Sequence, residues 1–348
     1  MPQPADHHGE RFRNNYSRPS HGMSWAFLRF LWELQTGDRE VPDVARETPD
    51  LAFLHGNRTD PSLTWLGHAS FLLQIDGHNI LTDPVLTERA SPLSFAGPAR
   101  VHPPGIAIDQ LPRIDVVVIS HDHYDHLDLP TLERLRERND PLLVAPLRLG
   151  AWLRERGFER VVELDWWQHQ DLERLRIHAV PVQHFSGRTA FDRNRRLWAG
   201  YVIEAGGRRV LFAGDTGYSR DFADIGERFA PIDLALIPIG AYDPRDFMGP
   251  VHVDPEEAVR IHRDVGAVRS VGMHWGTFRL TTEPMDEPPR RLRAAVAEAG
   301  LATDAFTTVP LGAVLRAPFA QSASRDSSAS STSARASEGS APSASTVR

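Results

Sequence analysis

The stretch Ile114-Asp-Val-Val-Val-Ile-Ser-His-Asp-His-Tyr-Asp-His126 decides the fold. The four β-branched residues at 116–119 predict a buried strand, because so short and so branched a run does not suit a helix. The strand is expected to end at Ser120, and the pattern His-x-His-x-Asp-His follows at once. The interpretation of the whole chain depends on this histidine-rich turn directly after a buried strand.

The spacing within this turn predicts a metal site. While the backbone stays extended, alternate side chains point the same way, so His121 and His123 can bind one ion together. Asp125 and His126 lie beyond that reach and can face a second ion, and imidazole with carboxylate suits zinc, iron or manganese. The alternative is a set of ordinary loop histidines, but these residues at these places would arise by chance in roughly a few of every thousand such chains.

The composition limits the chemistry that the chain can perform. Of the 348 residues, 41% are hydrophobic and 24% are charged, which is ordinary for a globular protein with a large core. There is no cysteine, and all 39 basic residues are arginine. This excludes disulfides, thiolate zinc sites, Cys nucleophiles, Schiff-base lysines and the lysine of a P-loop. The net charge of −7 does not indicate a broad nucleic-acid surface.

Three later predicted strands each lead to a further potential ligand. These residues are His184, Asp215 and His274. Strand ends at one rim of a layered fold converge, so distant residues can share a site. Seven ligands are more than one tetrahedral ion uses, which suggests two ions. We expect one ion at His121, His123 and His184, the other at Asp125, His126 and His274, and Asp215 as a bridge between them.

The order of the predicted elements indicates an α/β fold. A hairpin-like run over 70–83 is followed by strands and helices that interleave without the strict rhythm of a doubly wound sheet. Two mixed sheets covered by helices fit this pattern better than one parallel sheet. Asp83 and Asp128 could receive the spare N–H of ligand histidines, or could serve only in a turn and a helix cap.

The composition changes along the chain and predicts three regions. They are an N-terminal arm at 1–60, a compact domain at 61–318 and a disordered Ser/Ala-rich tail at 319–348. In the arm, residues 1–22 are expected to be loose, and 37–60 to form a connector. An amphipathic helix near 23–35, rich in Trp and Phe, would either lie in a membrane interface or pack on protein. No secretory signal and no membrane-spanning stretch is predicted.

The histidine motif, the Gly214-Asp-Thr-Gly217 turn and the other strand-end histidines resemble the metallo-β-lactamase fold superfamily. From about Leu63 to Leu315 the sequence looks most like the family of N-acyl-phosphatidylethanolamine-hydrolysing phospholipases D. The motifs that carry this likeness are Thr64-Trp-Leu-Gly-His-Ala69, Leu81-Thr-Asp-Pro84, Phe212-Ala-Gly-Asp-Thr-Gly-Tyr218, Ile237-Pro-Ile-Gly-Ala-Tyr242, His252-Val-Asp-Pro-Glu-Glu-Ala-Val259 and His274-Trp-Gly-Thr-Phe278.

The resemblance implies a four-layer αβ/βα sandwich with two zinc ions per chain, iron or manganese being alternatives. It implies a phosphodiesterase that releases N-acylethanolamine and phosphatidic acid from N-acyl-phosphatidylethanolamine, a phospholipid substrate and a homodimer. The expected location is cytoplasmic, with membrane association through 23–34 as an alternative. Nucleic acid is not an expected partner.

The same resemblance assigns roles to individual residues. The seven predicted ligands match the family's metal ligands, and Asp125 would also orient the attacking nucleophile. His252 matches a further active-site histidine, which would steady a phosphate oxygen or protonate the leaving alkoxide. Tyr124 and Arg188 match positions that contact substrate. Val251 departs from the family, because a polar Gln is expected there, so fine substrate contacts do not transfer.

Two other classes of function fit the same residues. A lactonase or a nucleotide phosphodiesterase could use the same scaffold and the same ligands. A metal-binding or scaffold protein without turnover is an alternative from another class, although seven intact ligands argue against a decayed site.

Overall fold

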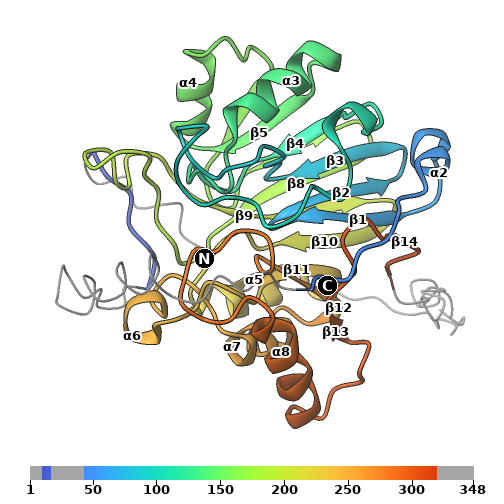
Figure 1. Ribbon diagram of the computed structural model, residues 1–348, viewed down its shortest axis with the longest axis vertical. Coiled ribbons are helices and arrows are strands. Elements are labelled where there is room, and N and C mark those ends of the chain that lie inside the picture. The colour runs from blue at the N-terminus through green and yellow to red at the C-terminus, as the bar shows by residue number, and fades with distance from the viewer. Residues whose placement is uncertain (1–9, 17–42, 320–348) are drawn as a thin grey trace, which may run out of the picture.

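Two seven-stranded sheets lie face to face at the centre of the protein (Figure 1). The computed structural model describes residues 10–16 and 43–319. The first sheet consists of β1 (Ser62–Gly67), β2 (Ser70–Ile75), β3 (His78–Thr82), β4 (Val116–Val118), β5 (Leu142–Pro146), β6 (Val161–Leu164) and β14 (Val314–Arg316). The second consists of β7 (His169–Leu172), β8 (Leu175–Val180), β9 (Gly200–Ala205), β10 (Arg208–Phe212), β11 (Ile232–Pro238), β12 (Ala267–Met273) and β13 (Phe306–Thr307).

Each sheet is antiparallel in one half and parallel in the other. The order of the first sheet is β14-β1-β2-β3-β4-β5-β6, and its pairs become parallel from β3 onward. The order of the second is β13-β12-β11-β10-β9-β8-β7, and its pairs become parallel from β10 toward β13. The predicted pair of mixed sheets is therefore correct.

Helices cover the outer face of each sheet. They are α2 (Leu51–Gly56), α3 (Leu129–Asn139) and α4 (Leu149–Arg154) beside the first sheet, and α5 (Asp221–Phe229), α7 (Pro255–Asp264) and α8 (Glu287–Glu298) beside the second. The short α6 (Arg245–Met248) and a 3-10 turn at Ile108–Gln110 lie in connecting loops. The result is the four-layer αβ/βα sandwich that the sequence predicts.

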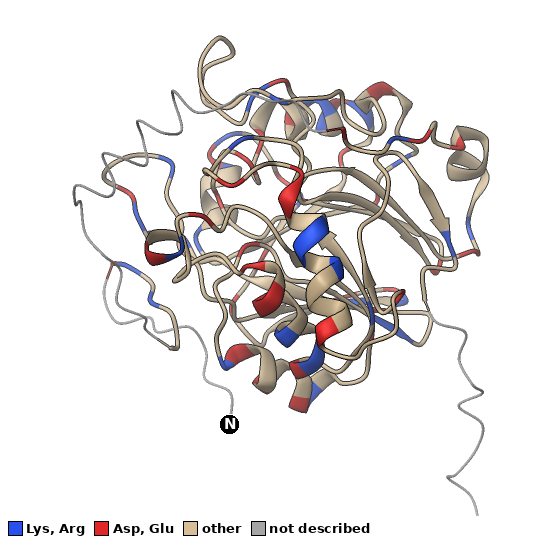
Figure 2. Ribbon diagram, turned by 60° about the horizontal axis from the view of Figure 1, so that its bottom comes forward, with Lys and Arg blue, Asp and Glu red and all other residues tan. Residues whose placement is uncertain are grey.

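The alternation of side chains along β4 explains how the layers hold together. Val116 and Val118 enter the core between the two sheets, while Val117 enters the separate core beneath α3 and α4. Successive residues of a strand point to opposite faces, so a continuous apolar run is what a sheet buried on both faces requires. The outermost helices need only one apolar face. In α8, Leu292 and Val296 are buried, while its exposed positions include charged residues such as Arg293 and Glu298; Figure 2 marks the charged positions on the ribbon.

The N-terminal arm differs from what its composition predicts. Residues 10–16 are packed on the domain rather than loose: Phe12 is 1% exposed and its backbone N–H donates to Asn194. The connector at 37–60 contains the helix α2. The predicted amphipathic helix near 23–35 and all but the first residue of the tail at 319–348 lie outside the described residues. Within the described part of the chain, no helix has the length and apolar character needed to cross a membrane.

Candidate metal centre

The seven predicted ligands meet at one rim of the sandwich. The turn 121–126 follows β4, and the other three ligands follow β8, β10 and β12. Their side chains form overlapping groups in which the candidate ligand atoms lie within 4.8 Å of one another. Residues up to 153 positions apart in the sequence are thereby brought to one place, as the strand-end pattern predicts.

His121, His123 and His184 form the first ligand group. The Nε2 atom of His121 lies 2.8 Å from Nδ1 of His123, and Nε2 of His184 lies 3.3 Å from that same atom. His121 and His184 are buried and His123 is partly buried, and burial is the main cause that lowers the pKa values of all three rings. Neutral imidazoles keep a lone pair for a cation, so this group suits metal binding.

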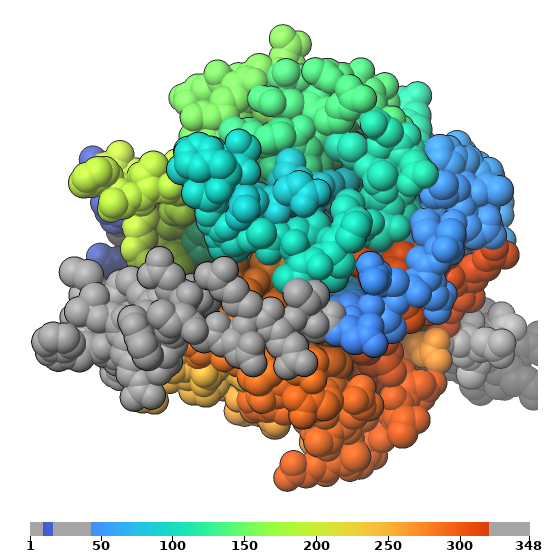
Figure 3. Space-filling model, viewed as in Figure 1, coloured from blue at the N-terminus to red at the C-terminus, as the bar shows by residue number. Residues whose placement is uncertain are grey.

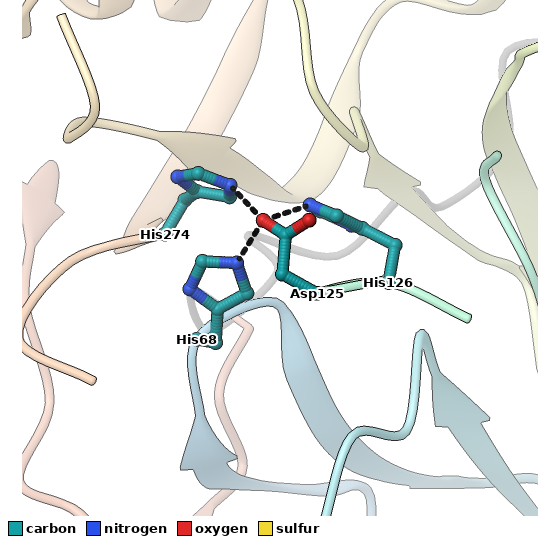
Figure 4. Close-up of side chains that lie close together, drawn as sticks. All are labelled: His68, Asp125, His126 and His274. Atoms are coloured by element: carbon teal, nitrogen blue, oxygen red, sulfur yellow. Dashed lines mark hydrogen bonds and ion pairs between the residues drawn. The ribbon is translucent and has the colours of Figure 1, made fainter. Parts of the chain in front are cut away.

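Asp125, His126 and His274 form the second ligand group (Figure 4). The Oδ2 atom of Asp125 lies 3.4 Å from Nε2 of His126 and 3.4 Å from Nε2 of His274. Burial alone would raise the pKa of Asp125, but the charge of His126 and the hydrogen bond with His68 lower it well below its usual range. The carboxylate is therefore ionised and available to a cation.

Asp215 lies between the two groups. Its Oδ2 atom is 3.1 Å from Nε2 of His126 in the second group and 3.7 Å from Nε2 of His184 in the first. Its Oδ1 atom is 3.1 Å from Nε2 of His274. One carboxylate thus faces both groups, which is the position that a bridging ligand needs.

The backbone around Asp215 approaches the histidine turn closely. Gly214 has φ +61°, and a Cβ atom there would lie 2.7 Å from Cβ of Ser120. Real Cβ atoms essentially never come so close, and the left-handed backbone also favours glycine. A side chain at Gly214 would push the Asp215 segment away from the turn 121–126.

Hydrogen bonds from outside the ligand set orient the rings. Asp83 accepts from Nδ1 of His126 at 2.7 Å and from the backbone N–H of Ser120, which turns Nε2 of His126 toward the site. Nδ1 of His184 lies 2.9 Å from the carbonyl oxygen of Val251. Such outer partners fix the tautomer and the orientation of a ligand histidine. Asp128, in contrast, accepts from Thr87 and Thr131 and contacts no ligand.

Several buried polar atoms of the centre lack a hydrogen-bond partner among the described residues. They are Nε2 of His126, Nε2 of His274, Oδ1 of Asp215 and Nδ1 of His252. Leaving a buried polar atom unpaired costs about 1–3 kcal/mol, and here these atoms gather around one space. Cations bound there would satisfy them. The donor set of imidazole nitrogen and carboxylate oxygen fits zinc, iron or manganese.

The predicted substrate residues border this centre. Nδ1 of His252 is 4.0 Å from Oδ2 of Asp215, and burial is the main cause that lowers the pKa of His252 to about 4. The guanidinium of Arg188 stacks 3.9 Å from the centroid of the Tyr124 ring, and Tyr124 donates its hydroxyl to the backbone carbonyl of Arg188. Arg188 in turn donates to the carbonyl oxygen of Asp122, so this pair forms a wall against the histidine turn.

His68 belongs to the same constellation, although the sequence interpretation did not assign it. Its Nε2 atom lies 2.9 Å from Oδ2 of Asp125, and its ring centroid lies 3.9 Å from that of His274 (Figure 4). Burial and His274 lower the pKa of His68 to about 3, so its ring is neutral and can donate to the carboxylate. The signal was present, because His68 directly follows β1 just as other candidate ligands follow their strands.

Comparison with known proteins defines the class to which this site belongs. Residues 78–275 match the family described as the beta-lactamase superfamily domain. The chain belongs to this superfamily, and it is a metallo-hydrolase of the beta-lactamase fold. The predicted fold class and superfamily are thus confirmed.

Two relatives in sequence and one solved structure are similar to most of this chain. An uncharacterized protein of Mycobacterium tuberculosis is 43% identical, over 76% of this chain and 72% of that protein. N-acyl-phosphatidylethanolamine-hydrolyzing phospholipase D 1 of Caenorhabditis elegans is 41% identical, over 73% of this chain and 75% of that enzyme. Igni18, a metallo hydrolase of Ignicoccus hospitalis, has a similar structure, with a TM-score of 0.57 and 25% identity over 74% of this chain and 98% of Igni18.

Proposed function

We propose that the protein is a phosphodiesterase of the phospholipase D type. Its reaction would cleave N-acyl-phosphatidylethanolamine to N-acylethanolamine and phosphatidic acid. The observation that carries this proposal is the pair of ligand groups joined by Asp215, in a chain 41% identical to the C. elegans phospholipase over most of both proteins.

The proposed cofactor is a pair of zinc ions, with iron or manganese as alternatives. His121, His123 and His184 would hold one ion, and Asp125, His126 and His274 the other, with Asp215 shared. Such a pair, when bound, makes water a nucleophile near neutral pH and offsets the negative charge that develops on a reacting phosphate.

The side chains around the ions would direct the reaction. Asp125 faces the centre with an ionised oxygen, so it can orient the attacking water and accept a hydrogen bond from it. His252 lies beside Asp215 with a free Nδ1 among the described residues. That position lets His252 steady a phosphate oxygen or give a proton to the leaving alkoxide. Tyr124 and Arg188 would contribute a wall of the substrate pocket.

Other parts of the proposal depend on residues or partners outside the described structure. Peripheral membrane contact through 23–34 would bring the centre to its phospholipid substrate. A homodimer and a cytoplasmic location, with membrane association as the alternative, complete the proposal.

Metal analysis combined with a substrate panel tests the proposed function. The purified protein would be assayed against N-acyl-phosphatidylethanolamine, lactones and cyclic nucleotides, with and without a chelator. We expect two ions per chain and chelator-sensitive hydrolysis of the phospholipid. Faster turnover of a lactone or nucleotide would favour the corresponding alternative, and bound metal without any turnover would indicate a non-catalytic metal protein.

A matched pair of histidine variants tests the ligand assignment. His184→Ala should lose one ion and most of the turnover. His169→Ala removes an exposed histidine of β7 and should keep both. Equal metal content and turnover in the two variants would contradict the role of His184.

A further inference from the structure

The N-terminal segment 10–16 lies directly against the first ligand group. The side chain of Asn14 donates from Nδ2 to the carbonyl oxygen of His184 at 2.9 Å. Its Oδ1 atom accepts from the backbone N–H of the same residue at 3.1 Å, and from Nε1 of Trp198 at 3.0 Å. A single amide group thus pairs with both main-chain polar groups of a candidate metal ligand 170 residues away.

The backbone of His184 has little other support. It lies beyond the end of β8, where the chain makes no regular strand ladder, and the neighbouring bridge is between Gln183 and Gly217. Buried N–H and C=O groups need partners, and here the Asn14 side chain replaces the missing ladder. The ring is fixed separately through the carbonyl oxygen of Val251.

The segment is fastened on both sides of Asn14. Before it, Phe12 is buried, its N–H donates to the carbonyl oxygen of Asn194, and Arg148 stacks 4.6 Å from the centroid of its ring. After it, Asn15 donates to Asp221 at 2.8 Å. Figures 1 and 3 show this segment in dark blue beside the yellow-green loop that follows His184. The contacts hold Asn14 in one place without relying on His184.

We propose that Asn14 is a positioning residue of the metal centre, which fixes the backbone of His184 so that its Nε2 stays within reach of the first ion. This inference rests on the proposed role of His184 as a ligand. If so, segment 10–16 helps to form the metal centre, although it lies outside residues 78–275, which match the superfamily.

The test compares two neighbouring asparagines in the full-length protein. Asn14→Ala removes the contacts to His184, whereas Asn15→Ala removes a hydrogen bond to α5 and leaves His184 untouched. Binding of Zn²⁺ would be measured by competition with a chelator, and the absorption spectrum of the Co²⁺-substituted protein would report ligand geometry. We expect Asn14→Ala to weaken one of two ions by roughly tenfold or more and to alter the spectrum, as loss of an outer partner does. Asn15→Ala removes one anchor of the segment but keeps both hydrogen bonds between Asn14 and His184, so it should lose much less affinity.

Two further variants make the result decisive. Asn14→Asp keeps the acceptor for the His184 N–H and should recover part of the affinity; it carries the test if Asn14→Ala fails to fold. Adding Asn14→Ala to His184→Ala should change metal binding no further, because coupled residues are not additive. Equal Zn²⁺ affinity and Co²⁺ spectra in Asn14→Ala and Asn15→Ala would overturn the proposal. His184→Ala by itself decides the ligand assignment, so the two failures are distinguishable.

Discussion

The two ligand groups are held in different ways. In the first group, neutral partners orient the histidines: a carbonyl oxygen faces His184, and the hydroxyl of Ser120 lies 2.8 Å from Nδ1 of His121. In the second group a carboxylate orients His126, because Asp83 contacts its Nδ1, and the ligand carboxylate of Asp125 is itself paired with His68. The first group therefore depends mainly on the path of the backbone, and the second mainly on carboxylate side chains. Substitutions that weaken one ligand group and not the other can test this difference.

Asp215 is shared, so its loss should have the largest effect. Asp215→Ala removes the carboxylate that faces both groups, and we expect weak binding of both ions. Turnover should fall by more than the roughly 10–100-fold typical of losing an outer partner. Metal content per chain and the rate on the phospholipid would measure this. Asp171→Ala, at an exposed strand residue, is the control; loss of only one ion in Asp215→Ala would argue against a shared ligand.

Asp83 should affect the second group most, because it contacts His126 directly and reaches His121 of the first group only through Ser120. Asp83→Ala leaves His126 and Ser120 without their acceptor, so we expect one ion to bind roughly 10–100-fold more weakly. The free energy of unfolding should also fall by about 1–3 kcal/mol, because buried donors lose their partner. Asp128→Ala is a matched control, since Asp128 is buried and hydrogen-bonded but contacts no ligand. Chelator competition would measure the zinc affinity, and chemical denaturation would measure the free energy of unfolding. Equal zinc affinities in Asp83→Ala and Asp128→Ala would show that Asp83 does not support a metal ligand.

His68 should have a smaller effect on the second group. His68→Gln alters the donor to Asp125, and we expect both ions to be retained while turnover falls by up to about tenfold, the lower end for an outer partner. His102→Gln is the control, because His102 is also buried but contacts the carbonyl oxygen of Gly276. Metal analysis beside steady-state kinetics would measure the difference. Loss of an ion from His68→Gln would instead make His68 a ligand.

Val251 should have the smallest effect. It contacts His184 through its backbone carbonyl, so Val251→Gln should leave both ions bound and their affinities changed by less than about twofold, the size of a neutral substitution. Zinc affinity is the measurement that checks this. A large loss would mean that the side chain, and not the backbone, supports the first group.

The sequence predicts best those features that local pattern determines. The β-branched run at 116–119 specifies β4, and the end of a strand determines where the next side chains lie in a layered fold. This is why the seven candidate ligands, up to 153 residues apart, could be placed at one rim. Their assignment as ligands is a prediction that this convergence supports.

Features that depend on contacts between residues far apart in the sequence could not be predicted from local sequence pattern. Residues 10–16 look loose because they are polar, yet Asn14 and Phe12 are held by partners more than 130 positions away. His68 was given no role from the sequence, although it directly follows β1, and its backbone takes the left-handed φ of +55°. Composition carries no information about which partner such residues meet.

The pairing of β1 with β14 has a consequence for how the protein is made. Thr64 of β1 pairs with Val314 of β14. During synthesis this edge of β1 therefore stays unpaired until about 250 further residues have been added. At ribosomal rates of roughly 5–20 residues per second, that wait lasts on the order of ten to fifty seconds. An unpaired strand edge recruits other chains during such a delay. A stop codon just before Val314 would leave every candidate ligand translated, yet we expect the shortened chains to aggregate.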